Sequence, residues 1–201
     1  MKSKFERKLE KVKEAAIKEN VPIIMDETLQ KIKATLKELN KTTINKILEI
    51  GTATGYSALC FSELLTDNGE IDTIERDEER IAKAKENINI LEGNKKINLY
   101  EGDAVEILKQ MDNRYDLIFI DASKSKYPIF LAESLRMLNP NGIIFADNVL
   151  YKGYVMSDYN KHKQRTAVTH LREFIKNATE NEELNTEISE VGDGLAIIYR
   201  N

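Results

Sequence analysis

The sequence predicts an α/β fold with a largely parallel, doubly wound sheet. Between residues 46 and 177, short apolar segments alternate with helical segments, and strands joined through helices run parallel with right-handed crossovers. Two further apolar segments, Leu184 to Glu190 and Leu195 to Tyr199, are separated only by a short turn around Gly192-Asp193-Gly194. A connection of that length suits antiparallel strands, so we expect a parallel sheet that ends in an antiparallel pair.

The first 40 residues are predicted to form a helical cap. Residues 2–19 are highly charged and place their apolar side chains on one helical stripe: Phe5, Leu9, Val12, Ala16 and Ile17. Pro22 ends this helix, and Asp26 is a candidate N-cap for a second helix that extends to Leu39. Such a prefix is typical of a lid or a dimer contact packed on one end of the core.

The remaining elements follow in order. Strands are expected at 47–50, 71–75, 97–100, 115–120 and 143–146, and turns at 67–69 and 139–142. Helices are expected from 56, from 77 to about 91, from 104 to 110, from 127 to 138 and from 166 to 177. No repeat, low-complexity tract or linker divides them, so residues 1–201 are predicted to form one domain.

Composition indicates an ordinary soluble globular chain. Of its 201 residues, 41% are hydrophobic and 32% are charged. The net charge of −4 provides no global attraction to nucleic acid. Cys60 is the single cysteine and lies in an apolar run, so we expect a buried, inert thiol and no intramolecular disulfide. With no signal peptide or membrane-spanning segment recognised, a cytoplasmic protein without a membrane partner is expected.

A glycine-containing turn follows the first predicted strand. Gly51 and Gly55 enclose Thr52-Ala53-Thr54, and a helix begins near Tyr56. The glycines allow a ligand to approach the backbone, and the helix directs free N–H groups to the same place. Glu49 beside the turn suits a cationic ligand, such as the amino-acid end of S-adenosylmethionine, rather than a nucleotide diphosphate. The Gly-x-x-x-Gly spacing also differs from that of dinucleotide sites. A plain strand–turn–helix joint without a ligand explains this turn about as well as a binding site does.

Acidic residues stand at or just past the ends of the first five predicted strands: Glu49, Glu75, Asp103, Asp121 and Asp147. Ligands of open α/β sheets bind at this edge. Glu75, twenty positions after Gly55, is placed to accept both hydroxyls of a ribose. Asp103, next to Ala104, is expected either to accept from an adenine amino group or to cap the following helix.

Asp121, Asp147 and Asn148 form a sharper constellation. Two carboxylates and an amide oxygen on adjacent strand ends favour Mg²⁺ or a similar divalent cation, with open positions for water and substrate oxygens. Lys124 follows Asp121 by three residues, and a neighbouring cation should lower the pKa of its amine toward that of a usable base. The alternative is a solvated loop lysine.

The chain resembles the metal-dependent O-methyltransferases of the catechol and caffeoyl-CoA type, and most closely the bacterial branch that contains the tRNA 5-hydroxyuridine methyltransferase. The resemblance runs from about Val21 to Tyr199 and rests on LEIGTATGYS, TIERD, EGDA, FIDASKSKY, ADNVLYKG and VGDGLAI. It implies strand order 3-2-1-4-5-7-6 in a Rossmann-like sheet of seven strands, and commonly a homodimer.

The resemblance also implies roles for individual residues. Asp121, Asp147 and Asn148 match the metal ligands, and Lys124 matches the proposed general base beside Asp121. The matches to S-adenosylmethionine contacts are Met25, Glu49, Gly51, Ser57, Glu75, Asp103, Ala104 and Asp121. Met25 is also explained as an ordinary core methionine.

Two questions stay open at this stage. A nicotinamide dehydrogenase would share the fold, and Tyr159-x-x-x-Lys163 imitates its catalytic dyad, but the glycine spacing is wrong for that class. The methyl acceptor is expected to be 5-hydroxyuridine in a tRNA anticodon or a small catechol-like compound. Basic residues after the Asp147-Asn148 pair are candidates for binding RNA phosphates: Lys152, Lys161, Lys163 and Arg165. His162 and His170 have no ligand spacing and receive no role.

Overall fold

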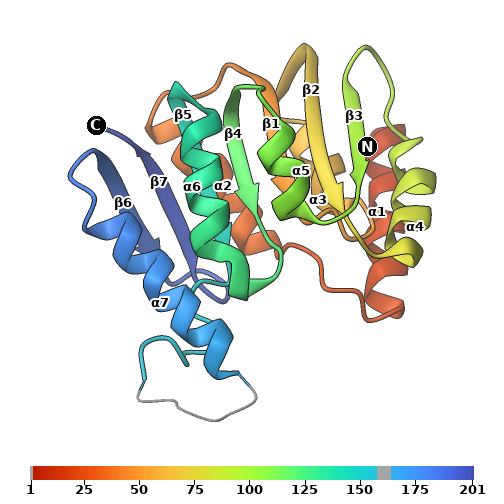
Figure 1. Ribbon diagram of the computed structural model, residues 1–201. Coiled ribbons are helices and arrows are strands. Elements are labelled where there is room, and N and C mark those ends of the chain that lie inside the picture. The colour runs from red at the N-terminus through yellow and green to blue at the C-terminus, as the bar shows by residue number, and fades with distance from the viewer. Residues whose placement is uncertain (1, 158–163) are drawn as a thin grey trace.

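A sheet runs through the middle of the molecule (Figure 1), whose computed structural model describes residues 2–157 and 164–201. Within these residues the sheet has seven strands in the order β3-β2-β1-β4-β5-β7-β6. The strands are β1 (Ile44–Ile50), β2 (Leu65–Glu75), β3 (Lys96–Glu101), β4 (Tyr115–Ile120), β5 (Leu138–Asp147), β6 (Leu184–Ser189) and β7 (Leu195–Arg200). β1 to β5 pair in parallel, and β7 is antiparallel to both β5 and β6. The predicted order and the antiparallel final strand are confirmed.

Helices cover both faces of the sheet. They are α1 (Lys4–Lys18), α2 (Asp26–Glu38), α3 (Tyr56–Ser62), α4 (Glu78–Ile88), α5 (Ala104–Gln110), the 3₁₀ turn η1 (Lys124–Lys126), α6 (Tyr127–Met137) and α7 (Arg165–Thr179). α5, α6 and α7 lie on the face toward the viewer, and α1, α2 and α3 lie behind the sheet (Figure 1). Two hydrophobic clusters correspond to these two layers.

β1 occupies the centre of the sheet because it is apolar on both faces. Leu48 and Ile50 belong to the cluster under α5 to α7, whereas Ile47 belongs to the opposite cluster, and all three are fully buried. Each such side chain contributes roughly 1.5–3 kcal/mol through its burial. The strand order reverses on either side of β1, between β2 and β4. The carboxyl end of β1 is therefore the place where open α/β sheets bind ligands.

Both predicted turns lie inside strands as bulges. Ile44 pairs with Leu65 but Lys46 pairs with Glu70, so β2 carries extra residues around Gly69 without leaving the sheet. A Cβ atom on Gly69 would lie 2.9 Å from the Leu65 Cβ, which shows how tightly the bulge folds back. β5 has a similar bulge at residues 139–142, where its register against β4 shifts. The prediction that these turns precede the strands is therefore wrong, because each strand already pairs with its neighbour before the bulge and continues to pair after it.

The N-terminal helices are packed against the sheet rather than separate from it. Val12 of α1 and Ile32 of α2 are buried in the same cluster as Ile47. Two details differ from the prediction: Ile17 is 59% exposed, and Asp26 is the first residue of α2 rather than its cap. The Asp26 carboxylate instead accepts from Lys13 Nζ at 2.6 Å, which joins the two helices. No helix in the described part of the chain has the length and apolarity needed to cross a membrane.

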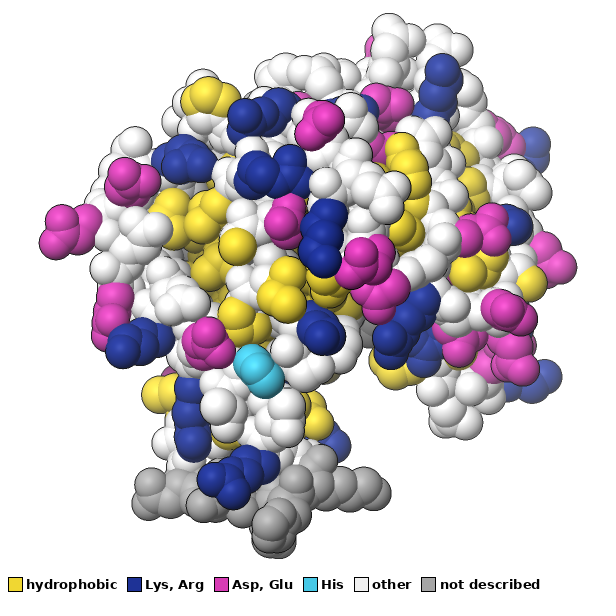
Figure 2. Space-filling model, viewed as in Figure 1, with side chains coloured by type: hydrophobic (Ala, Val, Ile, Leu, Met, Phe, Trp, Pro, Cys, Tyr) yellow, Lys and Arg dark blue, Asp and Glu magenta, His cyan; other side chains and the backbone are white. Residues whose placement is uncertain are grey.

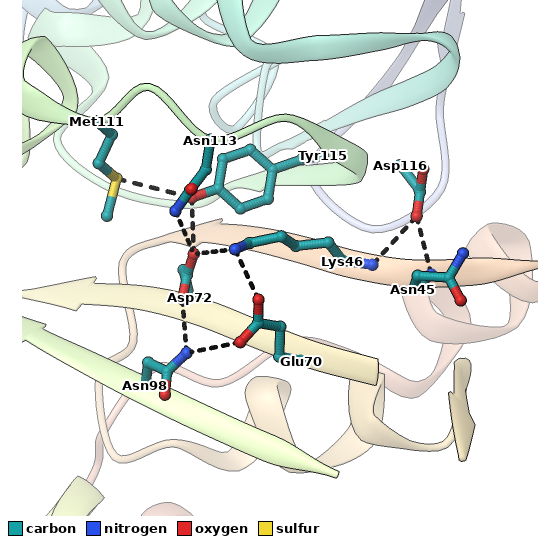
Figure 3. A network of polar contacts seen from close by, with 9 residues as sticks. All are labelled: Asn45, Lys46, Glu70, Asp72, Asn98, Met111, Asn113, Tyr115 and Asp116. Carbon is teal, nitrogen blue, oxygen red and sulfur yellow. Dashed lines mark hydrogen bonds and ion pairs between the residues drawn. The ribbon is translucent and has the colours of Figure 1, made fainter. Parts of the chain in front are cut away.

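A buried polar network joins the neighbouring strands β3, β2, β1 and β4 (Figure 3). Asp72 of β2 is 1% exposed, and it accepts hydrogen bonds from Tyr115 Oη and Asn98 Nδ2, both at 2.8 Å. Lys46 Nζ lies 3.5 Å from Asp72 and 2.7 Å from Glu70. The buried carboxylate is thus supplied with donors and a cation by its own neighbours, as the interior requires. This network needs no ligand.

Candidate cofactor and catalytic site

A cavity of about 550 Å³ opens at the carboxyl edge of the sheet. Its walls come from the segment before α2, the glycine turn and the residues that follow β2, β3, β4 and β5. They include residues 22–24, 51–54, 56–57, 74–76, 102–105, 121–124 and 148. A cavity of this volume matches a small-molecule site, and it lies at the reversal of strand order described above.

Gly51 brings the glycine turn against the end of β4. Its φ of +108° is a conformation that favours glycine. A Cβ atom at this position would lie 2.1 Å from the backbone oxygen of Asp121. Gly51 is therefore required both by its backbone conformation and by the close approach of the two strand ends that form the cavity floor.

Glu49 is a buried carboxylate with one unpaired oxygen. It is fully buried beneath the turn, and its Oε2 accepts from Thr73 Oγ1 at 2.5 Å. Its Oε1 has no hydrogen-bond partner among the described residues. Burial raises the pKa of Glu49 to about 8, although the hydrogen bond from Thr73 acts in the opposite direction. A ligand that brought an ammonium group to Oε1 would satisfy it and favour its ionised form.

Glu75 ties the glycine turn to the end of β2. Its Oε2 accepts from the Ala53 N–H at 2.9 Å, and its Oε1 accepts from the N–H groups of Arg76 and Asp77 at 2.8 and 3.0 Å. The side chain also lines the cavity. A carboxylate oxygen can accept more than one hydrogen bond, so both oxygens keep acceptor capacity for ligand hydroxyls.

Asp103 performs the capping role that was one of its two predicted roles. Its Oδ1 accepts from the Val105 N–H at 2.9 Å at the start of α5. Its Oδ2 lies 3.6 Å from an Arg76 guanidinium nitrogen. Because Asp103 and Ala104 also line the cavity, the capping role leaves the predicted adenine contact open.

Three oxygen atoms surround the amine of Lys124. Lys124 Nζ donates to Asp121 Oδ1 at 2.8 Å, to Asn148 Oδ1 at 3.0 Å and to Tyr127 Oη at 2.8 Å. The structure therefore brings together residues that follow β4 and β5, as the sequence predicted. Burial lowers the Lys124 pKa, but Tyr127 and Asp121 raise it more, so the net shift is upward. The predicted decrease of the Lys124 pKa requires a divalent cation nearby, so for the cation-bound protein it stays a prediction.

Asp147 is a buried carboxylate without an ion-pair partner among the described residues. It is 3% exposed, and its Oδ1 accepts from the Asn148 N–H at 2.8 Å. Burial first, and then the charge of Asp121, raise the pKa of Asp147 to about 6. The segment after it is fixed to the loop before β7, since the Val149 N–H donates to the Gly194 oxygen at 3.0 Å.

The donor set fits a hard divalent cation. Asp121, Asp147 and Asn148 offer two carboxylates and an amide oxygen, the ligand types that Mg²⁺ prefers. Asp121 and Asn148 already hold a cation, the Lys124 ammonium, between them. Among the described residues, no group of three or more His, Cys, Asp and Glu side chains could hold a metal ion.

Two polar partners were missed from the sequence. Thr73 binds Glu49, and the signal for it is strand register, because Glu49 of β1 and Thr73 of β2 are paired residues. Tyr127 binds Lys124, and the signal is its position three residues later, at helical spacing.

The other predicted positions have mixed outcomes. Met25 is 45% exposed and is not among the cavity-lining residues, although residues 22–24 are, so its cofactor contact stays a prediction. Cys60 is buried, and burial raises the pKa of its thiol to about 12, which confirms an inert cysteine. Tyr159, Lys161, His162 and Lys163 lie outside the described residues.

Comparisons with known proteins show the family of the chain. A sequence profile of the O-methyltransferase family matches residues 3–201. The chain is 35% identical over 116 residues to a catechol O-methyltransferase of Niastella koreensis, and this match covers 56% of the chain and 52% of that protein. It is 31% identical over 159 residues to the tapetum-specific methyltransferase 1 of Arabidopsis thaliana, covering 76% and 68% of the two chains. The match thus spans about half the length of the Niastella protein.

Solved structures have the same fold over nearly the whole chain. A Staphylococcus aureus protein, provisionally described as a caffeoyl-CoA O-methyltransferase, superposes with a TM-score of 0.84 at 32% identity and covers 96% of this chain and 92% of its own. A Podospora anserina methyltransferase bound to S-adenosylhomocysteine superposes with a TM-score of 0.77 at 26% identity, covering 100% and 89%. The chain therefore belongs to the O-methyltransferase family, of the catechol and caffeoyl-CoA type, and has the fold of S-adenosylmethionine-dependent methyltransferases.

Proposed function

We propose that this protein transfers the methyl group of S-adenosylmethionine to a hydroxyl oxygen whose neighbour on the acceptor is a second oxygen, with the help of a divalent cation such as Mg²⁺. The observation that carries the proposal is the convergence of Asp121, Asn148 and Lys124 at the rim of a cavity that Glu75 also lines. The cofactor and the cation would then be bound side by side at one pocket. The family membership and the S-adenosylhomocysteine bound by the Podospora relative support the cofactor.

The cofactor is proposed to lie along the glycine turn. Glu49 would accept from its ammonium group through the unpaired Oε1, and Ser57 would contact the same end. Glu75 would accept from the ribose hydroxyls. Asp103 and Ala104 would contact the adenine, on the far side of the cavity. Gly51 has no side chain to block the sulfonium from approaching Asp121.

Asp121, Asp147 and Asn148 would hold the cation. When bound there, it would lower the pKa of the acceptor hydroxyl and of Lys124, and would fix the acceptor oxygens. Lys124 Nζ then takes the hydroxyl proton. The oxyanion forms a bond to the methyl carbon as the carbon–sulfur bond breaks, which leaves S-adenosylhomocysteine. Because positive sulfonium and negative oxygen are both neutralised, a water-poor pocket that aligns them favours the step.

The acceptor is proposed to be 5-hydroxyuridine in a tRNA anticodon, giving 5-methoxyuridine. Its O5 hydroxyl and O4 carbonyl are adjacent, as are the two oxygens of a catechol, so one cation site serves both. An unstacked anticodon base is a suitable target for a small pocket. Lys126 lines the cavity, and Lys152 is exposed on the segment after β5. These are candidate phosphate contacts.

A small catechol-like acceptor is the second candidate, favoured by the name of the Niastella relative and by the charge distribution. The net charge is −4. On the face toward the viewer in Figure 2, basic side chains are interspersed with acidic ones. An RNA-binding protein more often gathers its basic residues in one patch.

Mass spectrometry of tRNA nucleosides separates the two acceptors. Cells that lack the protein should lose 5-methoxyuridine and accumulate 5-hydroxyuridine, and the purified protein should convert that tRNA in vitro. If 5-methoxyuridine is unchanged while catechol is methylated efficiently, the acceptor is a small molecule. A homodimer, which the family resemblance implies, is part of the same proposal, and sedimentation of the purified protein tests it.

A further inference from the structure

We propose that Tyr127 is the positioning residue of Lys124, holding its amine through a hydrogen bond anchored on the backbone ends of β4 and β5. The inference rests on the proposed role of Lys124 in methyl transfer. Tyr127 is the first residue of α6 and is fully buried. Its hydroxyl lies 2.8 Å from Lys124 Nζ, 2.7 Å from the Asp147 backbone oxygen and 3.3 Å from the Ile120 backbone oxygen.

The chemistry of these groups determines the direction of each hydrogen bond. A backbone carbonyl only accepts, so the single phenolic proton of Tyr127 is directed toward the Asp147 carbonyl, the nearer of the two. The phenolic oxygen can then only accept from Lys124, which donates. The amine is thereby connected through one rigid side chain to the backbone of β5, next to the side chains proposed to hold the cation.

Tyr127 differs in kind from the other two partners of Lys124. The oxygens of Asp121 and Asn148 belong to the proposed cation-binding set, so Lys124 shares both with the cation. The Tyr127 hydroxyl belongs to no such set, and Tyr127 is not among the residues that line the cavity, whereas Lys124 is. If a cation took the oxygens of Asp121 and Asn148, the hydrogen bond to Tyr127 would still hold the Lys124 amine at the cavity wall.

The aromatic ring is held firmly enough for this role. Its centroid lies 5.4 Å from that of Phe174 in α7, in an edge-on arrangement, and 6.3 Å from that of Phe130. Lys124 Nζ lies 4.9 Å from the centre of the same ring, within the range of a cation–π contact. Replacing Tyr127 by Phe keeps these ring contacts and removes only the hydroxyl.

Tyr115 provides a matched control. It is also fully buried, and its hydroxyl donates to a carboxylate, Asp72, at 2.8 Å. It is the first residue of β4, belongs to the network of Figure 3 and is not among the residues that line the cavity. Tyr115→Phe therefore removes an equivalent buried hydroxyl without touching the site.

The first test compares methyl transfer by the two variants to catechol and to tRNA that carries 5-hydroxyuridine. Tyr127→Phe should reduce kcat at least tenfold while KM for S-adenosylmethionine and the affinity for S-adenosylhomocysteine change less than twofold. Tyr115→Phe should lower Tm and leave kcat within twofold of wild type. A wild-type kcat in Tyr127→Phe overturns the inference, as does an equal loss of kcat in both variants.

Lys124→Met separates this inference from the proposed function. If Lys124→Met retains the wild-type rate, the proposed role of Lys124 fails. If Lys124→Met is inactive but Tyr127→Phe is as fast as wild type, only the positioning role fails. Thermal unfolding of the cation-free protein gives a readout that needs no acceptor. In the double variant of Lys124→Met with Tyr127→Phe, the decrease in Tm should be smaller than the sum of the two single decreases. In the double variant of Lys124→Met with Tyr115→Phe, the decreases should add. Additive decreases in both double variants would contradict the contact between Lys124 and Tyr127.

Discussion

Replacing Glu49 by Gln should change both the stability and the cofactor affinity of the protein, in opposite directions. Burial raises the pKa of Glu49 from an ordinary 4.5 to about 8 in the ligand-free protein. Because the pKa of Glu49 is higher in the folded than in the unfolded protein, its protonated side chain stabilises the fold fully below pH 4.5. This contribution is lost as the pH rises to about 8. The contribution lost over this window is roughly 4–5 kcal/mol. Glu49→Gln cannot titrate, so its Tm should fall less between pH 5 and pH 8.

Cofactor binding should show the opposite pH dependence. An ammonium group requires the ionised carboxylate, whose population rises about tenfold per pH unit below a pKa of about 8. The affinity for S-adenosylhomocysteine should therefore increase by nearly tenfold from pH 6 to 7, with proton release on binding. Glu49→Gln should bind far more weakly and show no such slope.

Isothermal titration calorimetry at pH 6, 7 and 8, in two buffers of different ionisation enthalpy, measures both effects. The wild type should release a proton to the buffer at pH 7, and the Gln variant should release none. A wild-type affinity for S-adenosylhomocysteine that is constant between pH 6 and 8 would show that Glu49 does not bind the ammonium group. So would the same slope in both proteins, because another group would then be titrating.

Three further substitutions test the remaining parts of the site. Glu75→Gln should weaken S-adenosylhomocysteine binding by roughly 2–3 kcal/mol in calorimetry, since a charged acceptor is lost; unchanged affinity would remove Glu75 from the cofactor site. Gly51→Ala should destabilise the fold by roughly 3 kcal/mol or more in urea, because its Cβ would clash with Asp121. Gly153→Ala, at a φ of +73° with open space around it, is the control and should cost about 1 kcal/mol; equal losses would show that backbone strain alone acts at Gly51. Lys124→Arg should bind cofactor but transfer methyl groups at least 10²-fold more slowly, because a guanidinium stays protonated; a variant near the wild-type rate would make Lys124 a purely electrostatic group.

Much of the fold could be predicted because β1 and its neighbours follow simple rules. A strand that is buried on both faces is mostly apolar, and Ile47, Leu48 and Ile50 of β1 follow this rule. Acidic residues at strand ends meet at one edge because parallel strands end together. Asp121 and Asn148 could therefore be placed near each other from β4 and β5 alone, and the structure places both within 3.0 Å of Lys124 Nζ.

The parts that could not be predicted depend on contacts between distant segments. The unpaired oxygen of Glu49 results from its full burial and from the strand register that gives Thr73 to the other oxygen. The anchor of Tyr127 is a backbone carbonyl, which every residue has and no motif reveals. The bulges at Gly69 and Gly142 preserve strand pairing through residues that locally favour turns. Side-chain chemistry also leaves the acceptor open, since adjacent oxygens occur in both candidates.

Methyl transfer is expected to depend on a divalent cation held by Asp121, Asp147 and Asn148. The most direct measurement follows transfer of a labelled methyl group from S-adenosylmethionine to catechol, or to tRNA that carries 5-hydroxyuridine, before and after EDTA and again after excess Mg²⁺. The rate should fall about 10²-fold or more with EDTA and recover with Mg²⁺, while S-adenosylhomocysteine binding stays unchanged and Asp147→Ala shows no recovery. A full rate in EDTA would contradict the dependence on a cation.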